Sequence, residues 1–159
     1  MDAMGTLRRW RVGNDCTARL LDSFDLFSEC TPKQLRAVAP LFCPIHAECG
    51  RVVVPEGRRP DQFIVVASGE AQVTVSGRLV GVIGPGSFAG ATAAIEDGIE
   101  PATVTVTEPM NLLVVTRVEL RSLLEIAPSL RRKLFPRADA DGRDGVRAGD
   151  GAQDGGRAA

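Results

Sequence analysis

The sequence predicts a mainly β domain with helices flanking the strands, because its hydrophobic periodicity changes twice along the chain. Between residues 41 and 116 the apolar residues follow a period of two, and Gly, Pro or Ser-Gly breaks recur at short intervals. Helical spacing and capping signals lie on both sides of that region. Many short strands separated by turns are typical of a β-sandwich or barrel.

Two short helices are expected before the strands. From Cys16 to Phe27 the apolar residues recur with near-helical spacing. Thr31 is then a helix N-cap, Pro32 suits the first helical position, and Gln34 completes a capping box. Pro40 would end this second helix.

Six strand cores are predicted in the central region, and the residues between them are interpreted as turns, Ser68-Gly69 and Glu108-Pro109 among them. The run at 112–115 is apolar on both faces and should be central in the sheet. The six cores are residues 52–54, 63–66, 73–75, 79–83, 104–106 and 112–115.

Helices return after the last strand. Thr116 and Glu119 form a second capping box, and a further helix restarts at Pro128. Residues after 135 are nearly all Arg, Ala, Asp and Gly, a composition that does not bury enough apolar surface to fold. We therefore predict an N-terminal arm, partly disordered, at 1–15, one domain at 16–135 and a disordered tail at 136–159.

Composition excludes several classes of protein. The chain has 159 residues, 44% hydrophobic and 25% charged, with a formal net charge of −1, so its overall charge does not favour binding to nucleic acid or to an anionic membrane. No apolar run is long enough to span a bilayer, and the N-terminus does not resemble a signal peptide. We expect a cytoplasmic protein.

Four cysteines, at positions 16, 30, 43 and 49, lack the Cys-x-x-Cys spacing of zinc or redox motifs. The segment Cys43-Pro-Ile-His46-Ala-Glu-Cys49 carries metal-ligand residue types, but Cys43 and His46 fall on opposite faces of a strand. Structural thiols are favoured, and a metal or iron–sulfur site is the alternative. His46 is the chain's one histidine, so the multi-histidine sites of cupin enzymes and a histidine-based nucleophilic pair are not expected.

The N-terminal arm carries Arg8, Arg9, Trp10 and Arg11. Such a cluster could contact nucleic acid or an acidic partner, but no basic face continues it along the chain. An arm that packs its tryptophan on the domain is the favoured interpretation.

Residues 84–106 contain the most informative stretch, Gly-Pro-Gly-Ser-Phe-Ala-Gly-Ala-Thr-Ala, an acidic loop, and then Glu-Pro-Ala-Thr-Val-Thr-Val. It resembles the phosphate-binding cassette of the cyclic-nucleotide-binding domain family, whose pattern is Gly-x-Phe-Phe-Gly-Glu-Leu-Ala, a loop, and Pro-Arg-x-Ala-Thr-Val. The matching residues are Gly86, Phe88, Gly90, Ala93, Ala102, Thr103 and Val104.

The resemblance covers about residues 20–135 and implies a β jelly roll (double-stranded β-helix) with N-terminal and C-terminal helices, similar to the sensor domain of catabolite activator proteins. In the family the cassette Glu binds the ribose and the cassette Arg binds the cyclic phosphate. Those positions are Ala91 and Glu100 here, and Glu100 is expected to form, with Glu96 and Asp97, an acidic rim that faces the place of the phosphate. The pocket positions that the resemblance implies are Phe88, Gly90, Ala91, Thr92, Ala93, Glu100, Pro101, Ala102 and Thr103.

With both ligand charges lost, we expect a non-catalytic, stand-alone regulatory or interaction module that binds cyclic AMP poorly, needs no cofactor and contacts another protein. The alternative is a genuine cyclic AMP sensor in which Arg58 or Arg59 replaces the lost cation. Many bacterial relatives carry a helix-turn-helix after the domain, but the Gly/Asp/Arg tail does not resemble one, so DNA binding is not expected. The C-terminal helix is a candidate surface for a homodimer.

Overall fold

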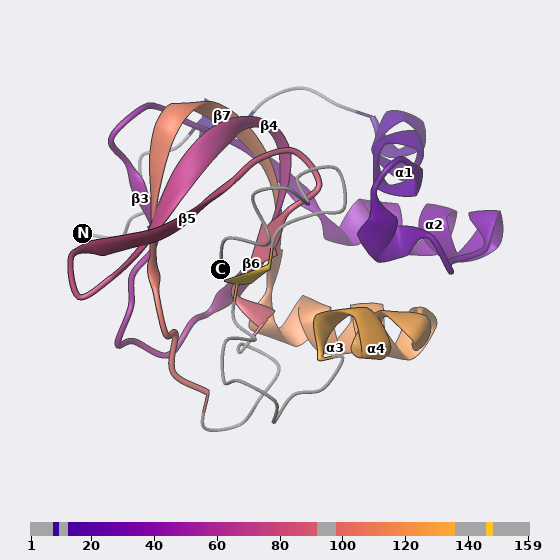
Figure 1. The fold of residues 1–159 in the computed structure, drawn as a ribbon. Helices are drawn as coiled ribbons and strands as arrows, with labels where there is room; N and C mark the ends of the chain where they lie inside the picture. The colour runs from indigo at the N-terminus through magenta and orange to yellow at the C-terminus, as the bar shows by residue number, and fades with distance from the viewer. Residues whose placement is uncertain (1–7, 10–12, 92–97, 136–145, 148–159) are drawn as a thin grey trace.

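The fold is a β roll with helices gathered at one end (Figure 1). The computed structural model describes residues 8–9, 13–91, 98–135 and 146–147. None of the helices within these ranges has both the length and the hydropathy that a bilayer span requires.

Two long strands, β4 (Gln62–Val75) and β7 (Thr103–Thr116), pair antiparallel and form the middle of the sheet. β7 carries β2 (Cys43–Ala47) and β3 (Val52–Val54) on its other edge. β4 carries β5 (Arg78–Ile83) and β6 (Phe88–Ala89). The sheet order is β1-β2-β7-β4-β6-β8, where β1 is Arg8–Arg9 and β8 is Val146–Arg147.

The predicted turns at Ser68-Gly69 and Glu108-Pro109 are corners within β4 and β7, so four of the six predicted strand cores join into two strands. The pairing register shifts at Val66/Ser68, Ser68/Glu70 and Glu70/Ala71. Gly69 has φ +93°, and a Cβ there would lie 2.3 Å from the carbonyl oxygen of Pro109. A β-bulge of this kind bends a strand pair without ending it, so turn-forming residues do not separate strands here.

Alternate residues of the two long strands supply two separate cores. Phe63, Val65, Leu113 and Val115 face the helices, whereas Ile64, Val66, Leu112 and Val114 face the inside of the roll. The run at 112–115 is therefore buried on both faces and central, as predicted.

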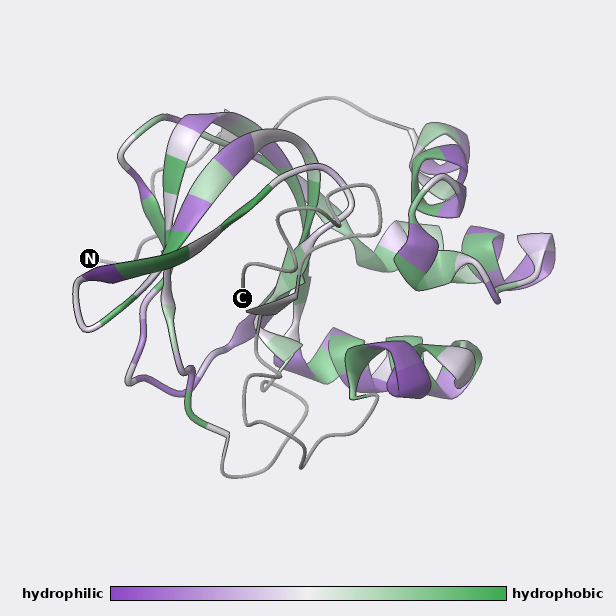
Figure 2. Ribbon diagram, viewed as in Figure 1, coloured by the Kyte–Doolittle hydropathy of each residue, from purple (hydrophilic) through white to green (hydrophobic). Residues whose placement is uncertain are grey.

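The helices cover the outer core. α1 (Asn14–Asp22) leads into a 3-10 turn, η1 (Asp25–Phe27), and α2 (Pro32–Val38) ends before Pro40 in a second turn, η2 (Ala39–Leu41). α3 (Arg117–Ile126) and α4 (Ser129–Leu134) follow β7. Both predicted capping boxes are confirmed, Thr31 with Gln34 and Thr116 with Glu119. Figure 2 shows green, apolar residues on strands and helices where they meet.

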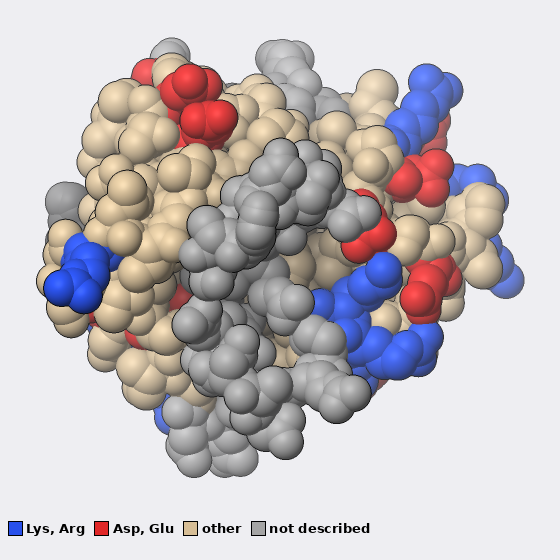
Figure 3. All heavy atoms as spheres, in the orientation of Figure 1, with Lys and Arg blue, Asp and Glu red and all other residues tan. Residues whose placement is uncertain are grey.

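The basic last turn of α4 contacts the N-terminal helical segment. Arg132 donates to Glu29 at 2.6 Å, and Lys133 lies 3.4 Å from Asp25. Figure 3 shows Lys and Arg gathered over this end of the molecule. These residues lie in the last turn of α4, where a cation complements the helix dipole, and they also pair with acidic residues of the N-terminal helical segment.

Parts of the predicted arm and tail take part in the sheet. Arg8 and Arg9 pair with His46 and Ile45 of β2, and the β8 residues pair with β6. The backbone of these four residues therefore forms short antiparallel pairs with β2 and β6. Trp10, Arg11 and the rest of the tail lie outside the described residues, so the predicted domain boundaries remain predictions.

Candidate functional site

The cassette-like stretch begins with a loop that is bonded to the centre of the sheet. Gly86 N donates to Val66 O, and Val66 N donates to Ser87 O, both at 2.8 Å. β6 then pairs with β4, with Phe88 opposite Val65 and Ala89 opposite Ile64. The Phe88 ring packs 5.8 Å from the Phe63 ring in the helix-facing core. Phe88 is therefore a core residue that anchors the cassette.

Gly90 is required by the neighbouring strand. Its φ is +85°, and a Cβ at this position would lie 2.3 Å from the carbonyl oxygen of Gln62 and 3.3 Å from Phe63 Cα. Residues other than glycine rarely adopt such a φ, and the close approach leaves no room for a side chain. The space beside the Gly90 backbone is occupied by β4.

Ala91, at the position of the family's ribose-binding carboxylate, is fully buried and belongs to the helix-facing core with Phe88. A methyl group there offers neither a charge nor a hydrogen bond. The next cassette positions, Thr92 and Ala93, lie outside the described residues, as do Glu96 and Asp97 of the predicted acidic rim.

Glu100, at the position of the family's phosphate-binding arginine, is only 1% exposed. Its main chain is held on both sides by the loop after β3, because Gly57 N donates to Glu100 O at 2.8 Å and Glu100 N donates to Arg58 O at 2.9 Å. The sequence suggested a carboxylate on an acidic rim. The structure instead places this carboxylate inside the protein, where charged side chains are rare.

Thr103 forms hydrogen bonds with a residue that the pocket prediction missed. Its hydroxyl donates to Glu56 Oε1 at 3.0 Å and accepts from Glu56 N at 3.1 Å. The same carboxylate accepts from Ser76 N at 2.9 Å, which ties the β4–β5 turn to the start of β7. Glu56 lies in the Pro-Glu-Gly segment at 55–57, and its link to Thr103 has no signal in the sequence.

The remaining pocket candidates differ in exposure. Ala102 is buried among the residues inside the roll, and Pro101 is half-buried. Arg58 and Arg59 are exposed. The main chain of Arg58 is hydrogen-bonded to that of Glu100.

The metal-type residues of β2 are dispersed. His46 Nδ1 lies 2.8 Å from Asn111 Oδ1 and Nε2 lies 3.1 Å from Glu48 Oε2. Within the residues that the structure describes, no group of three His, Cys, Asp or Glu side chains could hold a metal ion.

The four thiols are free, and none is fully buried. Cys16 and Cys49 are exposed, whereas Cys30 and Cys43 are half-buried. Packing in the core therefore explains at most two of the four cysteines, whereas a structural role was expected for all four. Burial raises the pKa of the Cys30 thiol, opposed by the Ser129 hydroxyl and reinforced by Glu29.

A hollow of about 430 Å³ lies between the N-terminal helical segment and the loop that precedes β6. It carries two carboxylates, which makes it unsuited to a phosphate. Its lining residues are Asp22, Ser23, Phe24, Asp25, Ser28, Pro85 and Gly86.

These observations describe a cassette frame without the charges of a cyclic-phosphate site. Phe88 and Gly90 pack this frame against β4. The buried carboxylate of Glu100 lies at the position where a cyclic phosphate would need a cation. A desolvated anion requires cations or N–H donors, and the side chain of Glu100 supplies neither at this position.

Comparison with known proteins identifies the same region. Residues 44–127, more than half of the chain, match the family model described as cyclic nucleotide-binding domain. Acetyltransferase Pat of Mycolicibacterium smegmatis is 31% identical over 94 residues, which cover 57% of this chain and 28% of that protein. The chain thus corresponds to less than a third of that relative's length.

Solved structures share the fold. The regulatory domain of Toxoplasma gondii PKA, solved with cAMP, has a TM-score of 0.65 and 25% identity, covering 77% of this chain and 48% of that one. The regulatory subunit of a cAMP-independent protein kinase A from Trypanosoma brucei has a TM-score of 0.69 and 12% identity, covering 80% and 49%. The predicted fold class, a β roll with flanking helices, is confirmed by the arrangement of strands and helices and by these neighbours.

Proposed function

Because the chain belongs to the cyclic nucleotide-binding domain family, we propose that it is a non-catalytic regulatory module whose pocket does not bind cyclic AMP tightly and which acts by contacting another protein. The observation that carries this proposal is the burial of Glu100 at the position of the family's phosphate-binding arginine.

The charge at this position decides the affinity for a cyclic phosphate. A carboxylate about 4 Å from a phosphate costs about 4 kcal/mol at an effective dielectric near 20. A protonated carboxyl would avoid the repulsion but would still supply no cation. At 1% exposure, Glu100 has little access to water that could screen the charge.

The ribose side of the pocket is weakened as well. Ala91 cannot replace a charged hydrogen bond, which is worth about 1.5–3 kcal/mol. Since about 1.4 kcal/mol is tenfold in affinity, the two terms together correspond to at least ~10³-fold weaker binding than an intact cassette provides.

Similarity of fold does not determine which ligand is bound. The two neighbours described above have comparable TM-scores, although one is described as bound to cAMP and the other as cAMP-independent. The residues of this chain therefore carry the proposal, and the shared fold contributes the regulatory role of the family.

Isothermal titration calorimetry with cyclic AMP and cyclic GMP tests the proposal on three proteins: the parent, Glu100→Gln and Glu100→Arg. Gln keeps the shape of the side chain and removes its charge, whereas Arg adds the missing cation. We expect no saturable heat from the parent up to ~1 mM ligand. Glu100→Arg should bind at least ~10-fold more tightly than Glu100→Gln, because an ion pair adds to the relief of repulsion.

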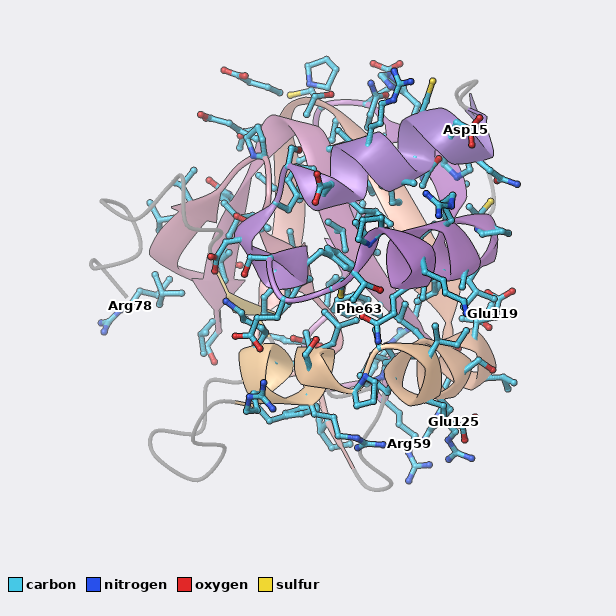
Figure 4. The ribbon with its side chains drawn as sticks, turned by 90° about the vertical axis from the view of Figure 1, so that its right-hand side faces the viewer. Asp15, Arg59, Phe63, Arg78, Glu119 and Glu125 are labelled. Atoms are coloured by element: carbon cyan, nitrogen blue, oxygen red, sulfur yellow. The ribbon has the colours of Figure 1, made fainter. Side chains whose placement is uncertain are left out.

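Glu125→Arg is the matched control, since it makes the same charge change on an exposed residue of α3 (Figure 4). It should leave binding at the level of the parent. Thermal unfolding of each variant establishes that it is folded. Tight binding of either nucleotide by the parent would refute the proposal.

A second function, a genuine cyclic-nucleotide sensor, is favoured by the position of Arg58 beside Glu100. In that case the exposed Arg58 guanidinium supplies the cation. The parent would then bind cyclic AMP with saturation, and Arg58→Ala would weaken that binding at least ~10-fold, the loss expected for one charged hydrogen bond.

The proposal also includes a cytoplasmic location, which is supported by the four free thiols, since oxidising compartments favour disulfides.

A further inference from the structure

β5 exposes an apolar surface at the edge of the roll. Leu79, Val80 and Val82 are 58%, 40% and 47% exposed. By their pairing, Leu79 lies opposite Thr74 and Val82 opposite Gln72, on the outer face of the β4–β5 hairpin. Figure 2 shows β5 as a mainly green strand at the front of the roll.

This strand also has an open edge among the strands that the structure describes, because β5 is hydrogen-bonded there to β4 alone. A strand edge with unpaired N–H and C=O groups is a template for another strand, and proteins usually protect such edges with charges or proline. The four residues after Arg78, Leu-Val-Gly-Val, contain neither.

The two ends of β5 carry opposite charges. Arg78 is exposed at its first position and projects away from the roll (Figure 4). Just after its other end, Glu70 lies close to Gly84, whose Cβ would be 4.0 Å from Glu70 Cγ. Glu70 pairs with Glu108 across the two long strands, and both are exposed, which makes this end acidic.

Opposite charges at the two ends make β5 complementary to a second copy of itself. Antiparallel pairing of two β5 strands about a two-fold axis places the Arg78 end of one copy beside the Glu70 and Glu108 end of the other. With the axis between Val80 and Gly81, Leu79 of each copy faces Val82 of its partner, a favourable apolar cross-strand pair.

We propose that β5 is the contact strand of a homodimer, which forms by antiparallel pairing of the β5 edges of two copies of this chain. The proposal extends the interaction role proposed above, because it names a second copy of this chain as the partner. It holds whether or not the pocket binds a nucleotide.

The C-terminal helices, the surface first considered for a homodimer, offer less exposed apolar surface. Leu120, Leu123, Leu124, Leu130 and Leu134 are all buried against the domain. Val118 is the one large apolar residue of α3 and α4 that is strongly exposed, at 74%.

A six-residue edge is a small interface, so the dimer belongs to the weak class, with a dissociation constant on the order of 10–100 μM. Sedimentation velocity of the full chain across about two decades of concentration around that range should show a monomer–dimer equilibrium.

Leu79→Lys and Val82→Lys should each abolish the dimer, because a lysine on an edge strand blocks pairing. Val118→Lys, which places the same charge on an exposed apolar residue of α3, is the matched control and should dimerise as the parent does. Thermal unfolding should be nearly unchanged in all three, since the side chains are exposed.

A charge exchange tests the antiparallel geometry. Arg78→Glu should weaken the dimer at least ~5-fold, and adding both Glu70→Arg and Glu108→Arg should restore it, because the two ends are again opposite in sign. A chain that stays monomeric throughout, a dimer that survives Leu79→Lys, or one that is lost in Val118→Lys would overturn the proposal. Nucleotide calorimetry tests the pocket separately, so the absence of a dimer would not change the conclusion about nucleotide binding.

Discussion

Gly90→Ala tests whether the cassette glycine serves packing against β4. The added Cβ lowers the free energy of unfolding in two ways. Alanine at φ +85° is strained by about 1–2 kcal/mol, and the methyl would lie 2.3 Å from the Gln62 carbonyl oxygen. Relieving a backbone clash of this kind by moving β6 away from β4 costs about 1–3 kcal/mol more.

The expected loss of unfolding free energy is therefore about 2–5 kcal/mol, or a fall in Tm of roughly 8–20 °C for a domain of this size. Urea unfolding followed by circular dichroism measures it. Gly77→Ala is the matched control, because Gly77 has φ +82° but nothing within 4 Å of its Cβ position. It should lose only the conformational term, about 1–2 kcal/mol.

Gly81→Ala completes the series. Gly81 lies in β5 with no positive φ and with open space at its Cβ position, so it should unfold like the parent or be slightly more stable. Equal losses in Gly90→Ala and Gly77→Ala would show that β6 moves freely, and the packing role of Gly90 would be wrong. A similar loss in Gly81→Ala would show that the method does not resolve these effects.

The remaining predictions concern Glu56 and Cys30, which lie outside the cassette. Glu56→Ala should lower the free energy of unfolding by about 1–3 kcal/mol in urea titrations, because Thr103 and Ser76 N lose their shared acceptor, whereas Glu56→Gln should lose less because it keeps one acceptor oxygen. Cys30 should be alkylated by iodoacetamide more slowly than exposed Cys16, as mass spectrometry would show, and equal rates in the folded protein would contradict the burial of Cys30. Since burial raises the pKa of the Cys30 thiol above its ordinary 9.0, its contribution to stability is complete below pH 9 and is lost as pH rises through the folded pKa.

Local chemistry made much of the fold predictable. The capping boxes at Thr31 and Thr116 form because side chain and backbone lie three residues apart, so no distant contact is needed. The corners at Gly69 and Pro109 were misinterpreted as turns because a bulge and a turn require the same residue types. Only the pairing of β4 with β7 distinguishes them, and that pairing joins residues about 40 positions apart.

Burial was the property least accessible from the sequence. Glutamate is usually exposed, so the composition of the loop suggested an acidic rim, whereas Glu100 is held inside by two main-chain hydrogen bonds to the loop after β3. The cysteines show the opposite error. Cysteine is among the residues most often buried, yet Cys16 and Cys49 lie on an outer helix and in a turn.

The burial of Ala91 changes what restoring the pocket would require. Exchanging two residues, Ala91→Glu and Glu100→Arg, would match the family's cassette in charge. Ala91, however, is fully buried in the helix-facing core, and a carboxylate placed among its apolar neighbours would have to be desolvated. The helices would have to shift to admit it. The packing of the helices on the roll therefore disfavours a carboxylate at this position. For this reason, the single change Glu100→Arg is a sharper test of the pocket than the double change.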